Sequence, residues 1–471
     1  MSRSRGKTAL KELASPLMRE ELEPQHGINE SAGKALYWNE ESETLPRGKL
    51  ELLQLDRLKA QIARATERVG FYREWAKRNA FSPVAIRSLE DLALLPFTSK
   101  TDLRDHYPFG MCAVPLSELV RVHATSGTTG KPTIAPYTRR DLELWAEVMA
   151  RVLTAGGVGP NDVVQNAYGY GLFTGGLGFG LGAETIGCAT IPTSSGLTSR
   201  QLVVMEDLGA TVLCCTPSYA LVIAEEAEAQ GIDFRRRMRL RLGFFGAEPW
   251  TEEMRREIED RLGLEAFDIY GLAEIIGPGV GVECQRHDGL HLFEDHFLAE
   301  IVDPESGKTL SPDSTGELVL TSLSREALPL LRYRTRDRVR LTREACPCGR
   351  TFARMSKPLG RTDDMLIIRG VNVFPSQIEA ALLEVDGLAP QYLILVDRER
   401  DRLDELEVWV EASPSLFAEG EYAMKRVSTE ANKRVRDVLG ISARVVVVTP
   451  KKIERGLGKA VRVVDRRSFQ S

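Results

Sequence analysis

Strands and helices alternate through the middle of the chain, and this alternation restricts the fold more than any other feature. Short apolar runs, typical of buried strands, occupy residues 211–215, 241–245 and 266–270. Segments with helical spacing of apolar residues precede or separate these runs, at 199–208, 218–230 and 251–262. Strands that alternate with helices pair mainly in parallel. The sequence therefore predicts an α/β fold built on a mostly parallel sheet.

Two of these predicted strands run directly into polar turns that contain glycine. Residues 246–249 follow one strand and residues 271–274 follow another. Ligands of parallel α/β sheets bind beyond the carboxyl ends of the strands. We therefore expect a ligand site at these two turns.

A loop rich in glycine and hydroxyl residues lies further upstream, at residues 124–133. Its glycines allow backbone N–H groups to approach an anion closely, and Lys131 adds a positive charge. It is not a Walker A loop, because only Thr128 and Thr129 separate its glycines and Pro132 follows the lysine. It predicts a phosphate-binding loop of another kind, and a polar loop without a ligand is the alternative.

Glycines and aromatic residues alternate over residues 168–182. Tyr168, Tyr170 and Phe173 are the aromatic members, and no glycine spacing fits a dinucleotide fingerprint. The segment predicts either an aromatic-lined pocket or a glycine-rich helix in close packing.

The ends of the chain differ from this core. Residues 50–79 have a continuous helical stripe, which predicts one long helix, either packed on its own domain or paired in a coiled coil. Extended pieces separated by turns follow Glu294 and indicate a more antiparallel region. A polar turn at 360–364 precedes a last α/β block. We predict an N-terminal extension (1–35), a large domain (36–361) and a small C-terminal domain (362–471).

Composition excludes several classes of protein. The 471 residues are 43% hydrophobic and 27% charged, with a net charge of -5, which argues against a nucleic-acid-binding surface. No apolar run reaches membrane-spanning length, and residues 1–35 lack the apolar core of a secretory signal. Seven cysteines, an odd number, favour a reducing cytoplasm over a disulfide framework. We expect a cytoplasmic protein without a nucleic-acid or membrane partner.

Six short motifs, in order, give the chain a resemblance to a known family. They occupy residues 126–132, 246–250, 268–274, 333–337, 360–364 and 458–460. The chain resembles the adenylate-forming superfamily of acyl-CoA ligases and luciferases, and within it the phenylacetate–CoA ligase family. The resemblance runs from about Tyr37 to the C-terminus.

The resemblance implies a two-step ligase that acts on an aryl or arylacetic acid. The carboxylate first attacks the α-phosphate of ATP, giving an acyl-adenylate and pyrophosphate, and coenzyme A then displaces AMP. It also implies the fold: a large N-terminal adenylate-forming domain and a small mobile C-terminal α/β domain, with a hinge at Asp363. A homodimer is expected.

The resemblance also implies roles for individual residues. Lys459 would bridge the carboxylate and the α-phosphate, Glu274 would hold Mg²⁺, and Lys131 would act with the phosphate loop. Tyr270 would stack on adenine, Asp337 would accept the ribose hydroxyls and Arg361 would reach the ribose or phosphate. The expected nucleotide-binding set is Ser126, Gly127, Thr128, Thr129, Gly130, Gly246, Ala247, Glu248, Pro249, Asp268, Tyr270, Gly271, Asp337 and Arg361. The aromatic acid would contact Tyr168, Tyr170, Phe173 and Gly246.

Three cysteines and a histidine form a separate set. Cys284, His291, Cys346 and Cys348 offer three sulfurs and one imidazole, which suits tetrahedral structural zinc. Some ligases of the family it resembles carry zinc near this place. His287 and His296 are competing ligands, and reduced cysteines in a turn are the alternative.

Two other functions remain open from the residues. The chain could adenylate its substrate and pass it to an acceptor other than coenzyme A. It could also be a nucleotide-binding homologue without turnover. A requirement for coenzyme A separates the first from a ligase, and absence of AMP production would indicate the second.

Overall fold

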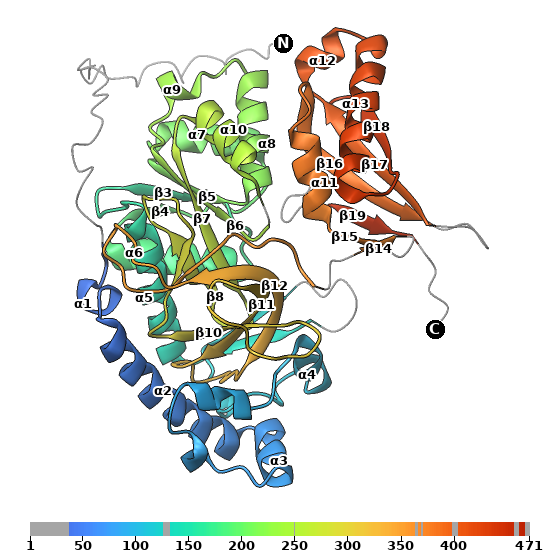
Figure 1. The fold of residues 1–471 in the computed structure, drawn as a ribbon. Coiled ribbons are helices and arrows are strands. Elements are labelled where there is room, and N and C mark those ends of the chain that lie inside the picture. Colours follow the sequence, from blue (N-terminus) through green and yellow to red (C-terminus); the bar gives the residue numbers. More distant parts are fainter. Residues whose placement is uncertain are drawn as a thin grey trace, which may run out of the picture. The chain divides into compact units, whose positions relative to one another are not determined.

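The computed structural model describes residues 37–125, 132–248, 250–362, 366–368, 371–397, 404–455 and 461–466. A sheet of eleven strands, in the order β10-β11-β12-β13-β9-β8-β7-β6-β5-β3-β4, forms the frame of the larger part (Figure 1). Its strands are β3 (Val163–Asn166), β4 (Ala189–Ile191), β5 (Val212–Cys215), β6 (Leu242–Gly246), β7 (Glu265–Leu272), β8 (Gly277–Glu283), β9 (Leu290–Leu292), β10 (Phe297–Val302), β11 (Thr315–Ser322), β12 (Tyr333–Thr342) and β13 (Arg354–Met355).

The pairing of these strands changes along the sheet. From β4 through β3, β5 and β6 to β7 all neighbours are parallel, as the alternation of strands and helices predicted. From β7 to β10 all neighbours are antiparallel. The antiparallel region after Glu294 is confirmed, but it starts earlier than expected, at β8, and continues the same sheet.

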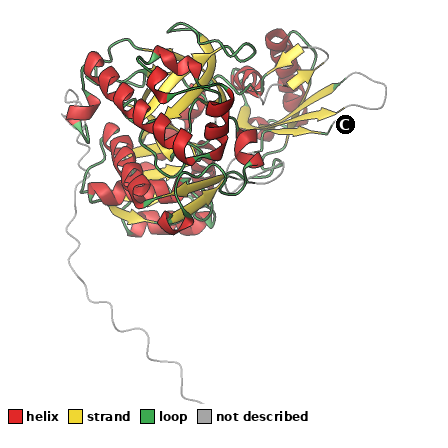
Figure 2. Ribbon diagram, turned by 90° about the horizontal axis from the view of Figure 1, so that it is seen from below, coloured by secondary structure: helices red, strands yellow, loops and turns green. Residues whose placement is uncertain are grey.

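Helices cover both faces of the parallel strands (Figure 2). Successive strand residues point to opposite faces, so neighbours in sequence enter different cores. Cys214 and Phe244 belong to one core with α5 (Arg139–Ala155) and α6 (Gly175–Ile186). Cys215 and Phe245 belong to the other. That second core contains α7 (Thr198–Asp207), α8 (Pro217–Ala229), α9 (Phe234–Arg237) and α10 (Glu252–Leu262).

Capping residues fix the ends of several of these helices. Thr138 and Asp141 form a reciprocal capping box at the start of α5. Thr251 caps α10, which ends at Gly263 in the left-handed conformation. The glycine-rich segment contains the packed helix α6, where Gly178 faces the Trp145 ring and Gly182 faces the Met149 backbone.

The predicted long helix over 50–79 is wrong in one respect. It is two helices, α2 (Arg47–Arg68) and α3 (Gly70–Arg78), because Val69 takes an extended conformation with φ of -99° and ψ of 122°. Its apolar stripe packs in the first core of its own chain, which supports the packed helix over the coiled coil. Shorter helices lie nearby: α1 (Glu40–Glu43), α4 (Lys100–Asp105) and 3₁₀ turns at Pro83–Ala85, Glu90–Leu94 and Leu116–Glu118.

An antiparallel pair flanks the predicted phosphate loop. Strand β1 (Arg121–Ala124) pairs with β2 (Ile134–Tyr137), and residues 126–131 between them lie outside the described residues. The backbone of β1 is held by the glycine-rich segment, because the Ala124 N–H donates to the Leu172 carbonyl over 3.0 Å.

The C-terminal part has a core of its own. A four-stranded sheet has the order β18-β17-β16-β19, and a second pair is β14-β15. Its elements are β14 (Leu366–Ile368), β15 (Val371–Val373), α11 (Pro375–Leu383), β16 (Leu388–Asp397), β17 (Glu405–Ala412), α12 (Pro414–Ala418), α13 (Glu421–Leu439), β18 (Arg444–Val448) and β19 (Val463–Asp465). The predicted α/β block is confirmed, and its long helix begins at Glu421, directly after Gly420. None of the helices among the described residues has both the length and the apolar character needed to cross a bilayer.

Candidate active site and thiol cluster

The end of β6 makes a sharp turn at the carboxyl edge of the sheet. A Cβ on Gly246 would lie 2.6 Å from the Ile269 carbonyl oxygen, so this position requires glycine. Ala247 follows with a φ of 70°, which is uncommon for a residue with a side chain. Glu248 then accepts a hydrogen bond of 2.7 Å from the Ser218 N–H, in the first turn of α8. The turn is therefore fixed by a glycine, by a left-handed residue and by a hydrogen bond to α8.

Tyr270, Asp337 and Arg361 come together from three distant segments. The Tyr270 hydroxyl donates to Asp337 Oδ2 over 2.5 Å, and Arg361 Nη1 donates to Asp337 Oδ1 over 3.0 Å. Burial, and then the Asp337 charge, hold the pKa of Tyr270 well above its usual range, so the hydroxyl keeps its proton. Asp337 is only 9% exposed, which excludes a surface ion pair.

Glu274 lies in the turn between β7 and β8. It is buried, and Lys100 Nζ approaches its carboxylate to 3.7 Å. Burial, and then the Glu274 charge, raise the pKa of Tyr333 well above its usual value. Gly271, at the end of β7, has no room for a Cβ because the Gly277 carbonyl oxygen would lie 2.2 Å from it. A buried carboxylate with one exposed lysine as counter-charge fits a Mg²⁺ ligand, since this ion prefers carboxylate oxygens.

Asp268 is buried two residues before Tyr270 on the same strand. Burial, and then the charge of Glu283, raise its pKa to about 7. Lys357 Nζ lies 4.0 Å from its carboxylate and 4.5 Å from the centre of the Trp250 ring. The Asp268 N–H donates to Glu283 Oε2 over 2.8 Å. Its carboxylate therefore belongs to a polar cluster with Lys357 and Trp250, next to Tyr270 on the same strand.

The aromatic residues of the glycine-rich segment do not share one environment. Tyr168 is buried and stacks on Phe179 with the ring centres 5.1 Å apart. Its hydroxyl has no hydrogen-bond partner among the described residues. Tyr170 Oη accepts from Asn166 Nδ2 over 3.0 Å. Phe173 is 52% exposed.

Several predicted site residues lie outside the described residues, and the structure says nothing of them. They are Ser126, Gly127, Thr128, Thr129, Gly130, Lys131, Pro249, Asp363 and Lys459.

The three cysteines and the histidine of the predicted metal site meet in a buried cluster. Cys284 Sγ lies 3.8 Å from Cys346 Sγ, and Cys348 Sγ lies 3.4 Å from His291 Nε2. All four potential ligand atoms lie within 4.8 Å of one another. Hydrogen bonds from the thiols of Cys284, and then of Cys346, hold the pKa of Cys348 below its usual range. The cluster can therefore hold a metal.

The two competing histidines lie elsewhere. His287 contacts Glu265 over 3.0 Å and Glu283 over 3.4 Å. His296 contacts the Ser324 hydroxyl over 2.8 Å and Asp295 over 3.2 Å. Neither of them belongs to the cluster.

Four residues near the site were missed by sequence reasoning. Lys100, Tyr333 and Lys357 contact the predicted carboxylates, and Arg325 contacts the backbone around Glu274. Tyr333 opens the motif at 333–337 but was given no role there. Lys100, Lys357 and Arg325 lie outside all six motifs and reach the site through the fold alone.

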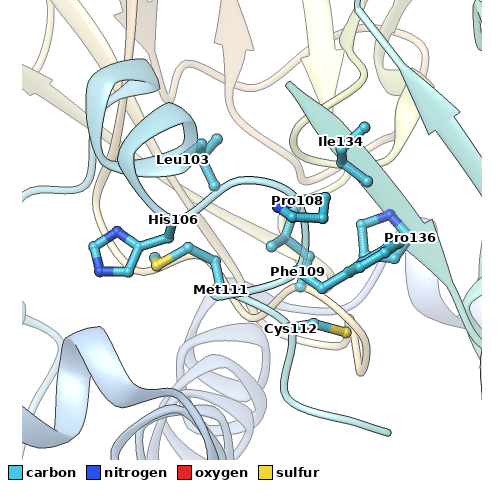
Figure 3. A pocket seen from close by; sticks show the side chains of 9 residues that line it. Leu103, His106, Pro108, Phe109, Met111, Cys112, Ile134 and Pro136 are labelled. Carbon is cyan, nitrogen blue, oxygen red and sulfur yellow. The ribbon is translucent and has the colours of Figure 1, made fainter. Parts of the chain in front are cut away.

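A small pocket beside β2 does not compete with this site (Figure 3). Leu103, Phe109 and Ile134 are among the side chains that line it. Its free volume is about 10 Å³, room for one water molecule at most.

The fold and the strand-end site define the chain as an AMP-binding enzyme. The AMP-binding enzyme family matches residues 109–324, and the AMP-binding enzyme C-terminal domain family matches residues 370–467. The chain belongs to the phenylacetate–CoA ligase family of these enzymes.

Two relatives and one solved structure support this membership. The chain is 49% identical to the phenylacetate-coenzyme A ligase of Thermus thermophilus over 92% of this chain and 100% of that protein. It is 47% identical to the Escherichia coli protein of the same name, over 91% and 97% respectively. A crystal structure of 2-hydroxyisobutyryl-CoA ligase with 2-HIB-AMP, in its postadenylation state, has a TM-score of 0.85 and 33% identity, and covers 91% of this chain and 92% of that one. The predicted family and fold class are confirmed.

Proposed function

We propose that this protein joins an arylacetic acid, phenylacetate first among them, to coenzyme A at the expense of ATP. The observation that carries the proposal is the meeting of Tyr270, Asp337 and Arg361 at the carboxyl edge of the sheet, beside the turn at Gly246. A donor, a buried carboxylate and a guanidinium within hydrogen-bond reach suit the ring, ribose and phosphates of a nucleotide.

The residues of this site divide the work of the first half-reaction. Asp337 accepts hydrogen bonds from the ribose hydroxyls, and Tyr270 offers its ring to adenine. Arg361 neutralises charge at the ribose or α-phosphate. Glu274 would hold Mg²⁺, and the ion would supply charge stabilisation for the departing pyrophosphate. The nucleotide and the acid would lie beside the backbone turn after Gly246.

The remaining predicted roles concern residues outside the described ones. Lys131 and its loop would hold the β- and γ-phosphates, and Lys459 would bring the carboxylate to the α-phosphate. Asp363 would be the hinge between a large domain (36–361) and a small domain (362–471). The acid pocket is the exception, because its residues are described: the aromatic acid would lie against Tyr168, Tyr170, Phe173 and Gly246. The homodimer stays a prediction.

We propose zinc for the thiol cluster. A tetrahedral site with zinc–sulfur bonds of about 2.3 Å spaces its sulfurs roughly 3.8 Å apart. The separation of Cys284 Sγ and Cys346 Sγ is 3.8 Å. The site lies apart from Glu274 and its ligands are all buried, which favours a structural rather than a catalytic ion.

An acid panel with ATP tests the function. Phenylacetate, indoleacetate and benzoate are incubated with the protein and ATP, with and without coenzyme A, and AMP and thioester are measured. The proposal expects AMP and thioester in equal amounts, only with coenzyme A. AMP release without thioester would favour another acceptor, and no AMP from any acid would favour a non-catalytic homologue.

A lysine pair tests the division into half-reactions. Lys459→Ala should abolish adenylation yet retain thioester formation from premade phenylacetyl-adenylate. Lys452→Ala, an exposed lysine close in sequence, is the matched control and should retain both activities. Loss of both half-reactions in the Lys459 variant alone would refute this role.

A further inference from the structure

A buried arginine outside all the motifs contacts the turn that carries Glu274. Arg325 is 0% exposed and lies after β11. Its Nη1 donates to the carbonyl oxygens of Glu274 over 2.8 Å and of Ile275 over 2.6 Å. Its partners here are main-chain atoms of the turn itself. The guanidinium therefore fixes the backbone from which the Glu274 carboxylate projects.

The same guanidinium also holds the strand that leaves the predicted phosphate loop. Arg325 Nη2 donates to the Pro136 carbonyl over 2.9 Å, and its Cζ lies 4.4 Å from the centre of the Tyr137 ring. Both residues belong to β2. One planar side chain thus spans β2 and the Glu274 turn, which are more than a hundred residues apart in sequence.

Two aromatic side chains complete this connection. The Tyr137 hydroxyl donates to the Ile276 carbonyl over 2.8 Å, and Trp145 Nε1 donates to the Pro278 carbonyl over 2.9 Å. The two rings stack with centres 5.0 Å apart and planes at 13°. The consecutive carbonyls of Glu274, Ile275 and Ile276 therefore have fixed donors from Arg325 and β2, and Trp145 of α5 holds the start of β8.

Fully buried guanidinium groups are rare, because the charge loses its hydration. Both Nη atoms of Arg325 donate to carbonyl oxygens, whereas its Nε has no partner among the described residues. A fork of N–H donors can bridge two backbone segments in a fixed geometry, whereas the point charge of a lysine cannot. The Arg325 main chain is itself held, since Gln61 Nε2 donates to its carbonyl over 2.7 Å. Arg325 is therefore held both at its main chain and at its guanidinium.

We infer that Arg325 is a positioning residue for adenylation, which sets the Glu274 carboxylate relative to β2 so that Mg²⁺ and the phosphates of ATP meet in one geometry. The inference rests on the proposed function and assigns it a residue far from the nucleotide motifs. Arg325 acts through Glu274. It therefore serves the metal-dependent first half-reaction and has no part in the attack of coenzyme A on the acyl-adenylate.

The test compares Arg325→Met with Arg151→Met. Arg151 is equally buried in the same domain but pairs with Asp295, away from Glu274. Each variant is assayed for phenylacetate-dependent ATP–pyrophosphate exchange over a range of Mg²⁺ concentrations, and for thioester formation from premade phenylacetyl-adenylate. Misplacement of a catalytic group by about 1 Å costs on the order of 100-fold in rate.

Arg325→Met should lower the rate of ATP–pyrophosphate exchange by about 100-fold. It should need more Mg²⁺ for its half-maximal rate, and it should retain thioester formation. Arg151→Met should keep the Mg²⁺ requirement of the wild type. Should Arg325→Met not fold, Tyr137→Phe removes only the hydroxyl at Ile276. It should raise the Mg²⁺ requirement roughly 2- to 10-fold, the value of one hydrogen bond.

A double-mutant cycle shows whether Arg325 acts through Glu274. In a Glu274→Gln background, Arg325→Met should lower exchange no further. Losses that multiply, or equal losses in both half-reactions, would overturn the inference, as would an unchanged Mg²⁺ requirement in both Arg325→Met and Tyr137→Phe. A wild-type protein without exchange would overturn the proposed function itself, and this inference with it.

Discussion

Adding one methyl group at two positions of α6 should have opposite effects on stability. Gly180 and Gly182 lie two residues apart in this helix, and both are buried. A Cβ at Gly180 would meet only Tyr170 Oη, at 3.8 Å. A Cβ at Gly182 would lie 2.6 Å from Met149 Cβ and 2.7 Å from the Met149 carbonyl carbon. The first position has space for alanine, and the second is occupied by the backbone of α5.

The magnitudes follow from these distances. Alanine is favoured over glycine inside a helix by about 1 kcal/mol. Gly180→Ala should gain up to that amount. Overpacking costs about 1–3 kcal/mol, and the upper end applies at Gly182 because a helix backbone cannot rotate away as a side chain can. The net loss for Gly182→Ala is then about 2 kcal/mol, which separates the two variants by about 3 kcal/mol.

Thermal unfolding followed by circular dichroism measures this difference. For a domain of this size, 1 kcal/mol shifts the Tm by roughly 2 °C. Gly180→Ala should raise the Tm by about 2 °C and Gly182→Ala should lower it by about 4 °C. The two variants share the helix, the substitution and the burial. Equal Tm values, or a higher Tm for Gly182→Ala, would refute the packing of α6 on α5.

Three further predictions concern the clusters of polar residues. Cys346→Ser should remove zinc and lower the Tm, whereas His287→Gln should retain zinc; metal analysis that finds no zinc in the wild type would contradict both. Asp337→Asn should raise the KM for ATP roughly 10- to 100-fold, the value of hydrogen bonds to a charged group, and leave the KM for coenzyme A unchanged in steady-state assays. The pKa of Asp268 is raised to about 7, above that of the unfolded chain, so the folded state loses stability as the pH rises from about 4 to about 7. Asp268→Asn should therefore raise the Tm more at pH 8 than at pH 5, and a pH-independent gain would contradict this origin.

Local signals predicted the regular elements well. The predicted helix over 251–262 matches α10 to within one residue, because its caps, Thr251 and Gly263, are its direct neighbours in sequence. The break between α2 and α3 was missed, since Val69 keeps the apolar spacing while its backbone turns extended. The early start of the antiparallel strands at β8 was also missed. Parallel and antiparallel strands have the same two-residue alternation of side chains, so the sequence pattern does not show where the strand direction reverses.

The motifs named several residues that meet at the candidate site. Residues outside the motifs were missed, because only the fold brings them to the site. The predicted ligand set contained His291, with His287 and His296 as competing ligands. Only the structure shows that His291 is the histidine in the thiol cluster. Tyr270, Asp337 and Arg361 were named from motifs, yet their mutual hydrogen bonds depend on the pairing of the sheet. Arg325 was not found at all, because its partners are backbone atoms.

The choice of backbone atoms as partners has an evolutionary consequence. Arg325 holds carbonyl oxygens at Pro136, Glu274 and Ile275, and every residue type offers the same carbonyl. The side chains at positions 136 and 275 can therefore change in a lineage without loss of these contacts. No compensating substitution is required, so the connection would leave no pair of co-varying positions. In related sequences the connection would be visible only as an arginine retained at position 325.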